Sequence, residues 1–425
     1  EKMNTKKLLL VFAVTCLVAG LAFAEKLVVW TWYGAELGQV FQELVKTDFT
    51  AKTGIEVEIE VVPIDGIMNK LLLSFIGGDA PDIVELYSNQ VVELGIRGAL
   101  LNLSEFADVK SVTDQLNPML LPALQYKSAL FALPGEINWT WTYYRTDVFS
   151  EMGLEVPETW DDIRALALKL KARNMDTYYY YQGDGEIVGK YLPFVFQRGA
   201  DIYKPDGTAS NLDSPEAVAA FKELTDLHKQ YHLPVEDPIW GTFASAETPL
   251  QILQNWYYAG FELTNPQISG KWDITLFPGT KRADGSIDRT NTGKMLTWSI
   301  VSSTKHKDAA WELMKWLGST EFTTKFMQTS NQIHGNRIFF SNKDSIDFAP
   351  FPEEKLHLAK EALATCRMQT AVVGGHIANR YIDFAFNKVV IQGDDPETAI
   401  RQAAKESTDE IQRKLREFDR YIKTL

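Results

Sequence analysis

The stretch KLVVWTW (Lys26–Trp32) opens the pattern that decides the fold. It is rich in β-branched and aromatic residues, which is typical of a strand. Residues 36–52 follow with apolar side chains spaced along one helical face, and Gly54 stands where a helix stop is expected. A second strand is predicted at 55–62, a helix at 66–76 and a buried strand from residue 82. The order β-α-β-α-β predicts a parallel sheet covered by helices.

Residues 1–24 precede this pattern and have the features of a secretory signal peptide. Lys6 and Lys7 come before an apolar run, and Ala22-Phe23-Ala24 fits a cleavage site. Glu1-Lys2 stand before Met3 and are treated as a scar outside the fold. Cys16 lies early in the apolar run behind a poor lipobox, so a lipid anchor is not expected. We therefore expect cleavage and a periplasmic location.

Composition limits the classes of function. The chain has 425 residues and a net charge of −13, and the leader is itself net positive, so the remaining chain is more acidic still. About 400 residues suffice for two domains of ordinary size. The negative charge disfavours nucleic acid as a partner. Cys366 is the only cysteine beyond the leader, which leaves no intrachain disulfide.

Further helices and strands are predicted downstream. Residues 138–145 alternate like a strand, and a capped helix is expected over 158–174, where Thr159 and Asp162 form an acidic capping box. Ser214 and Pro215 begin another helix. The stretch 353–423 is mostly helical and ends in an alternating-charge helix at 396–422.

Four segments, in order, resemble the extracellular solute-binding proteins of carbohydrate ABC importers, the maltose-binding-like group. The segments are FTAKTGIEVEI (49–59), GGDAPDIVELY (77–87), ALFALPGEINWTWTYYRTDVFSEMGLEVPETWDDIRALALKL (129–170) and TGKMLTWSIVSSTKHKDAAWELMKWLGSTEF (292–322). The resemblance implies an α/β, type II-like periplasmic-binding-protein fold with a ligand cleft between two hinged lobes. Lobe 1 is expected to comprise 25–135 plus about 293–345, and lobe 2 about 136–292 plus 346–425.

The implied function is capture of a sugar and its delivery to the membrane subunits of an ABC importer, by a monomer that uses no cofactor and no metal. A sugar ring offers a C–H face to aromatic rings and hydroxyls to carboxylates and amides. Ligands of α/β sheets sit at the carboxyl ends of strands. The candidate ligand-binding residues are Trp32, Tyr33, Glu36, Tyr87, Ser88, Asn138, Trp139, Asp184, Trp240, Asn265, Trp298, Gly375 and His376.

One position departs from the family pattern. Asn265 stands where many members have a stacking Trp, so another aromatic residue such as Trp240, or one in the run 178–181, is expected to replace it. Each candidate Trp also has a plain core interpretation, which we prefer for Trp30. Two other functions stay open at this point: the same fold with a polyamine, amino acid or metal complex as ligand, and a secreted glycoside hydrolase with paired carboxylates.

Overall fold

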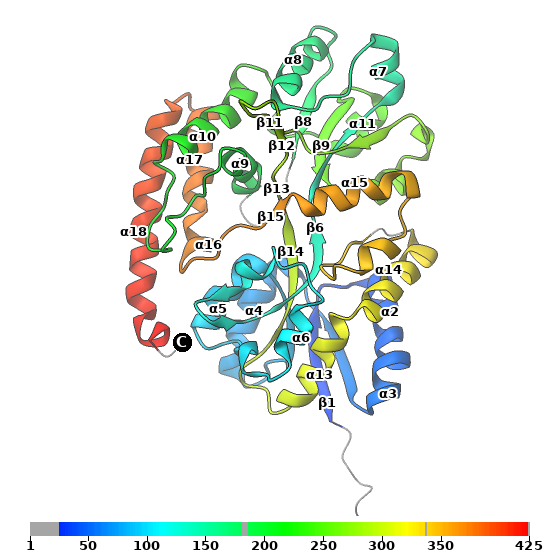
Figure 1. Ribbon diagram of the computed structural model, residues 1–425, viewed down its shortest axis with the longest axis vertical. Helices are drawn as coiled ribbons and strands as arrows, with labels where there is room; N and C mark the ends of the chain where they lie inside the picture. Colours follow the sequence, from blue (N-terminus) through cyan, green and yellow to red (C-terminus); the bar gives the residue numbers. More distant parts are fainter. Residues whose placement is uncertain (1–24, 181–185, 336–337, 424–425) are drawn as a thin grey trace, which may run out of the picture.

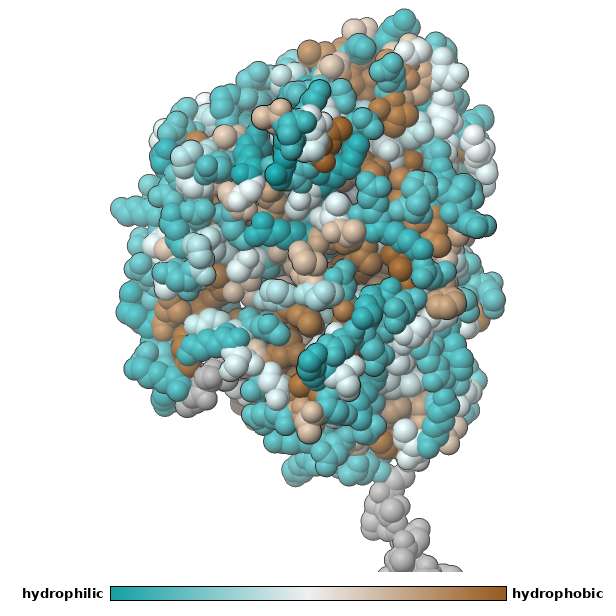
Figure 2. All heavy atoms as spheres, viewed as in Figure 1, coloured by the Kyte–Doolittle hydropathy of each residue, from teal (hydrophilic) through white to brown (hydrophobic). Residues whose placement is uncertain are grey.

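The computed structural model describes residues 25–180, 186–335 and 338–423. Two α/β lobes lie one above the other along the long axis of the molecule (Figure 1). Figure 2 shows hydrophilic residues over most of the same face, with apolar residues gathered in smaller patches. None of the helices in the described part of the chain has the length and apolarity needed to cross a membrane.

The first lobe is built on a mixed five-stranded sheet. In spatial order its strands are β2 (Glu56–Val61), β1 (Lys26–Thr31), β3 (Ile83–Tyr87), β14 (Lys294–Ile300) and β6 (Leu133–Asn138). β1 pairs in parallel with β2 and with β3, which confirms the β-α-β-α-β prediction. β14 then inserts antiparallel between β3 and β6. The helices of this region are α2 (Ala35–Leu44), α3 (Ala51–Thr53), α4 (Ile64–Gly77), α5 (Ser88–Ile96), α6 (Val109–Thr113), α13 (Lys307–Leu317) and α14 (Thr320–His334).

The helical segment predicted over 36–52 differs from a regular α-helix. It runs as α2, then as a π-helical segment from Val45 to Thr50, then as the single turn α3. Gly54 ends it with φ of 74°, a left-handed conformation that glycine adopts without steric cost. The predicted stop is therefore confirmed.

The second lobe is built on a four-stranded sheet. Its strands, in spatial order, are β10 (Asp273–Thr275), β7 (Thr140–Tyr144), β9 (Leu250–Gln254) and β8 (Thr177–Tyr179). Its helices are α7 (Thr146–Met152), α8 (Trp160–Lys171), α9 (Glu186–Phe196), α10 (Pro215–Lys229), α11 (Ile239–Ser245) and α12 (Tyr257–Thr264). The two-residue strands are β4 (Gln125–Tyr126), β5 (Ala129–Leu130), β11 (Thr280–Lys281), β12 (Ile287–Asp288), β13 (Asn291–Thr292) and β15 (Cys366–Arg367).

The last four helices, α15 (Glu353–Ala364), α16 (Gly375–Ala378), α17 (Arg380–Val390) and α18 (Pro396–Ile422), complete the chain. α18 packs on α10 and α17 of the second lobe and reaches α5 of the first with its final turns (Figure 1). Phe418 is buried there against Val92 and Ile96, and the Arg97 guanidinium lies 5.0 Å from the Phe418 ring centroid. The Lys127 ammonium donates to the carbonyl of Ile422 at 2.9 Å. α18 thus joins the two lobes along one side.

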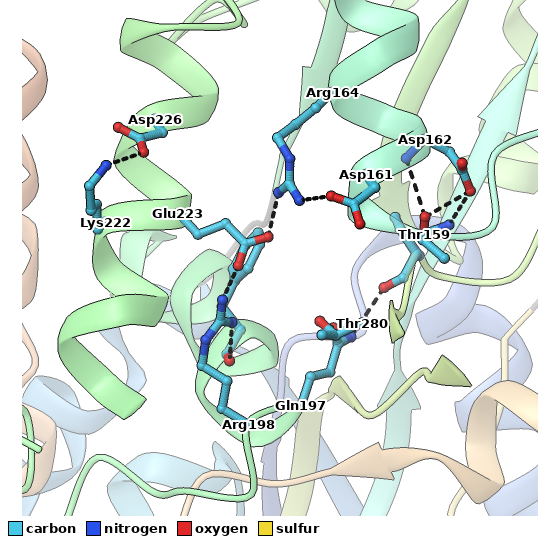
Figure 3. Close-up of polar contacts among 12 residues, drawn as sticks. Thr159, Asp161, Asp162, Arg164, Gln197, Arg198, Lys222, Glu223, Asp226 and Thr280 are labelled. Carbon is cyan, nitrogen blue, oxygen red and sulfur yellow. Dashed lines mark hydrogen bonds and ion pairs between the residues drawn. The ribbon is translucent and has the colours of Figure 1, made fainter. Parts of the chain in front are cut away.

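Polar contacts fix the helices of the second lobe (Figure 3). Arg164 of α8 pairs with Glu223 of α10, and Glu223 also pairs with Arg198, just after α9. At the start of α8 the Thr159 hydroxyl accepts from the Asp162 amide at 3.2 Å, and the Asp162 carboxylate accepts from the Thr159 amide at 2.9 Å. This reciprocal pair is the predicted capping box.

The first lobe contains a buried carboxyl, Glu85 on β3. Its Oε2 accepts from the Thr31 hydroxyl at 2.6 Å and from the Trp32 amide at 3.2 Å, which ties the end of β1 to β3. Burial is the main cause that raises the pKa of Glu85 to about 8, and the hydrogen bond from Thr31 opposes it.

Substituting Thr159→Ala should lower the free energy of unfolding by about 1 kcal/mol, because the Asp162 amide loses its acceptor. Thr159→Ser keeps the oxygen and is the matched control. Urea unfolding followed by circular dichroism measures both variants. Equal stability of the Ala and Ser variants would contradict the capping role.

Glu85→Gln should remove a pH dependence of stability. In the unfolded chain Glu85 ionises near its ordinary pKa of about 4.3. The folded state therefore holds the extra proton from about pH 4.3 to about pH 8, and stability falls as pH rises through this window. Denaturant unfolding at pH 5, 7 and 9 should show the wild-type stability declining relative to Glu85→Gln. If the free energies of unfolding of the two proteins changed in parallel with pH, Glu85 would not be protonated in the folded state in this pH range.

Candidate functional site

A cleft lies between the lobes and consists of two adjoining cavities that share Tyr87 and Lys294 in their walls. The larger has a volume of about 440 Å³ and the smaller about 70 Å³. The larger cavity is lined by Trp32, Leu37, Ile64, Tyr87, Glu136, Asn138, Trp240, Gln254, Trp256, Ala259, Gly260, Leu263, Thr264, Lys294, Leu296 and Ile338. A volume in this range, with mostly apolar walls and a few polar groups, is usual for a small-molecule site.

The first lobe supplies Trp32 and Tyr87, as the sequence predicts from their places at strand ends. Trp32 directly follows β1, and Tyr87 is the last residue of β3. Because these parallel strands end at the same edge of the sheet, both side chains reach the cleft. The Lys294 ammonium lies 4.1 Å from the Tyr87 ring centroid, a cation–π contact that positions the ring between the two cavities.

Two polar side chains of β6 face the same cavity. Glu136 is 6% exposed, and its Oε1 accepts from the side-chain Nδ2 of Asn138 at 3.0 Å. Its Oε2 is buried and has no hydrogen-bond partner among the described residues. Burial raises the pKa of Glu136 to about 7, while the hydrogen bond from Asn138 and the charge of Lys294 oppose this shift. An unpaired carboxylate oxygen in a cleft wall can accept a hydrogen bond from a bound solute.

The second lobe contributes an aromatic wall. Trp240 comes from α11, and Trp256 follows β9 just before α12. Trp256 stacks on Tyr257 with ring centroids 3.8 Å apart, and its indole N–H donates to Gln254 Oε1 at 3.4 Å. Trp240 and Trp256 have centroids 6.2 Å apart. Together they bring two aromatic rings to the cavity that Trp32 also lines.

The smaller cavity brings together residues of α5, α16 and the segment before α16. Ser88, Gly375 and His376, three of the predicted residues, line it. The Asn89 Nδ2 lies 3.3 Å from His376 Nδ1, which links the two lobes across the cleft. Gly375 and His376 are the first two residues of α16.

Three predicted residues are instead in the core of the first lobe or at its joint with the second, and their assignment to the cleft wall was wrong. Tyr33 is fully buried against Phe41 and Phe326, because adjacent residues after β1 point to opposite sides and Trp32 takes the cleft side. Trp298 lies deeper along β14 than the cleft-lining residues, stacked on Phe41. Trp139 is fully buried where β6 leads into β7.

Two further predictions need correction, and one lies outside the described residues. Glu36 is exposed in the first turn of α2, with Oε2 3.7 Å from His334 Nδ1, and does not line either cavity of the cleft. Asn265 lies behind Trp240, lines a separate depression and donates from Nδ2 to the Trp240 carbonyl at 3.1 Å. Asp184 lies in the segment that the structure does not describe.

Among the cleft residues missed from the sequence are Glu136, Gln254, Trp256 and Lys294. Two of them, Gln254 and Trp256, carry the signal that identified Trp32, since they stand at the carboxyl end of a strand. Gln254 ends β9 and Trp256 follows it, but the strand LQILQ (250–254) was not predicted. Glu136 alternates with Asn138 along β6 and shares its side of the strand.

Comparison with known proteins places the chain in a family. Residues 31–323 match the model of the bacterial extracellular solute-binding proteins. The chain is 24% identical over 333 residues to the diacetylchitobiose binding protein DasA of Streptomyces coelicolor, covering 75% of each chain. It is 24% identical over 299 residues to the maltotriose-binding protein of Pyrococcus abyssi, covering 68% of this chain and 62% of that protein.

Solved structures show the same fold. The sugar-binding protein MalE from Xanthomonas citri matches with a TM-score of 0.78 at 18% identity, covering 93% of this chain and 99% of that one. An ABC transporter solute-binding protein from Thermotoga lettingae, bound with alpha-D-tagatose, matches with a TM-score of 0.73 at 24% identity, covering 91% and 100%. With its two-lobed fold and the family match over most of its length, the chain belongs to the bacterial extracellular solute-binding proteins, a family of binding proteins rather than enzymes.

Proposed function

We propose that this protein binds a sugar in the cleft between its lobes and delivers it to an ABC importer. The observation that carries the proposal is the composition of the larger cavity. Trp32 of one lobe and Trp240 and Trp256 of the other give aromatic surfaces, and Glu136, Asn138 and Gln254 lie among them. Aromatic faces cover the C–H surface of a sugar ring, while carboxylates and amides bind its hydroxyls. Relatives named for diacetylchitobiose and maltotriose support the same class of ligand.

An importer must distinguish the ligand-bound protein from the free protein. Closure of the lobes on the ligand would give the bound protein a different shape. The chain crosses between the sheets at the junction of β6 with β7 and again between β13 and β14. We propose lobe 1 as 25–135 plus about 293–345 and lobe 2 as the rest, with these crossings as the hinge. Closure on a sugar would bring the Trp32 wall toward the Trp240 wall.

The site of action follows from the family, whose members are extracellular. We propose that residues 1–24 direct export and are removed, and that the mature protein works as a monomer in the periplasm. Its net negative charge disfavours binding to nucleic acid.

A sugar ligand should raise the melting temperature, because a solute that binds only the folded state stabilises it. The panel should include tagatose, maltose, maltotriose and diacetylchitobiose. At a ligand concentration 100 times Kd the stabilisation is about 2.7 kcal/mol. Tryptophan fluorescence should change with the same ligand, since three Trp line the cleft. If no sugar changes either signal while an amino acid, a polyamine or a metal complex does, the ligand class is wrong.

Glu136→Gln should weaken binding of the identified sugar by about tenfold or more, because a hydrogen bond to a charged group contributes about 1.5–3 kcal/mol. Wild-type affinity should rise as pH increases from 6 to 8, since the carboxylate ionises with a pKa of about 7 and its charged form is the better acceptor. The variant should lose this pH dependence. Isothermal titration calorimetry measures both.

Glu43→Gln on α2 is the matched control for Glu136→Gln, because Glu43 is exposed and lies outside the cleft. Its affinity should equal that of the wild type at each pH. If Glu136→Gln behaved like this control, Glu136 would not contact the ligand.

A further inference from the structure

Trp240 lies directly over a glycine of α12. A Cβ atom built on Gly260 would lie 2.3 Å from Trp240 Cη2 and 2.8 Å from Cζ3, closer than non-bonded carbons can approach. Gly260 is not in the left-handed region of the backbone, so its own conformation does not require glycine. Glycine is therefore needed at this position because it leaves room for the indole, and not because of its backbone conformation.

Two further side chains of α12 contact the indole. Its centroid lies 4.8 Å from that of Tyr257 and 5.0 Å from that of Phe261, both on α12. The main chain is also fixed, because the Asn265 side chain donates to the Trp240 carbonyl. Trp240 is only partly buried, and its uncovered side lines the larger cavity. A side chain at position 260 would therefore displace the indole into the cavity.

We propose that Gly260 is a positioning residue that sets the depth of the cleft by giving the outer end of the Trp240 indole room to lie against α12. This inference rests on the proposed sugar-binding function and adds a determinant of ligand shape. With glycine at 260, the Trp240 face is recessed and leaves room for a ring stacked on it. With any larger residue, the indole would occupy part of the 440 Å³ that the ligand needs.

The test is a double-mutant cycle with Gly260→Ala, Trp240→Phe and their combination. A phenylalanine ring lacks the outer atoms of the indole that approach Gly260, so the Trp240→Phe variant should tolerate alanine there. Gly241→Ala is the matched control, since a Cβ at Gly241 in α11 meets nothing within 4 Å. Calorimetry with the panel sugar that gives the largest thermal shift measures Kd, and thermal unfolding without ligand measures Tm.

Gly260→Ala should weaken binding about tenfold or more when Trp240 is present, and should leave Kd unchanged in the Trp240→Phe background. Its effect on Tm should also change sign. It lowers Tm beside Trp240 because of the overlap, and raises Tm in the Trp240→Phe background because alanine is favoured over glycine inside a helix. Gly241→Ala should leave Kd unchanged.

Two results would overturn the inference: additive effects of the two substitutions on Kd, or an undiminished affinity of Gly260→Ala. Failure of the proposed function is a separate outcome. If no panel sugar binds the wild type, the proposed sugar-binding function is wrong, and the role of Gly260 in setting the depth of a sugar site is wrong with it. The Tm values of the four proteins in the cycle still show whether Gly260 and Trp240 are in contact.

Discussion

The antiparallel insertion of β14 between β3 and β6 is the constraint on which the cleft depends. It places Lys294 opposite Asn138 and Leu296 opposite Tyr87, so that residues from three distant parts of the sequence share one wall. The same strand follows directly on β13, where the chain returns from the second lobe. Main-chain pairing therefore determines both the position of the polar groups in the cleft and one of the crossings between the lobes.

Local sequence patterns predicted much of the fold. The strands and helices up to Tyr87 repeat short, regular periods, and the cap at Thr159 and the stop at Gly54 are local signals. The place of β14 could not be predicted in this way, because its register depends on distant partners, and those on β3 lie more than 200 positions away. The π-helical segment after α2 likewise leaves no mark in the apolar spacing.

Residues that line the cleft could be predicted where a strand end was recognised. The prediction failed where the depth of a side chain within the lobe decided its place. Trp32, Tyr87, Asn138 and Trp240 line the larger cavity as expected. Tyr33 and Trp298 are of the same residue types, yet they lie in the core, since composition does not say on which side or at which depth a ring lies. Asn265 does not stack on anything in the cleft, and it instead holds the main chain of the Trp that supplies the wall.

The joint made by the end of α18 has a consequence for the order of folding. The first strand of the chain lies in the lower lobe, and the last helical turns are the ones that contact α5 of that lobe (Figure 1). Non-local contacts form late because their loop-closure entropy must be offset first. A chain that emerges from its N-terminus holds β1, β2 and β3 long before β14 exists to cover the edge of β3. Unpaired strand edges promote aggregation, so the partly made chain is most vulnerable until β14 has paired with β3, and the joint with α5 can form only after α18 has been made.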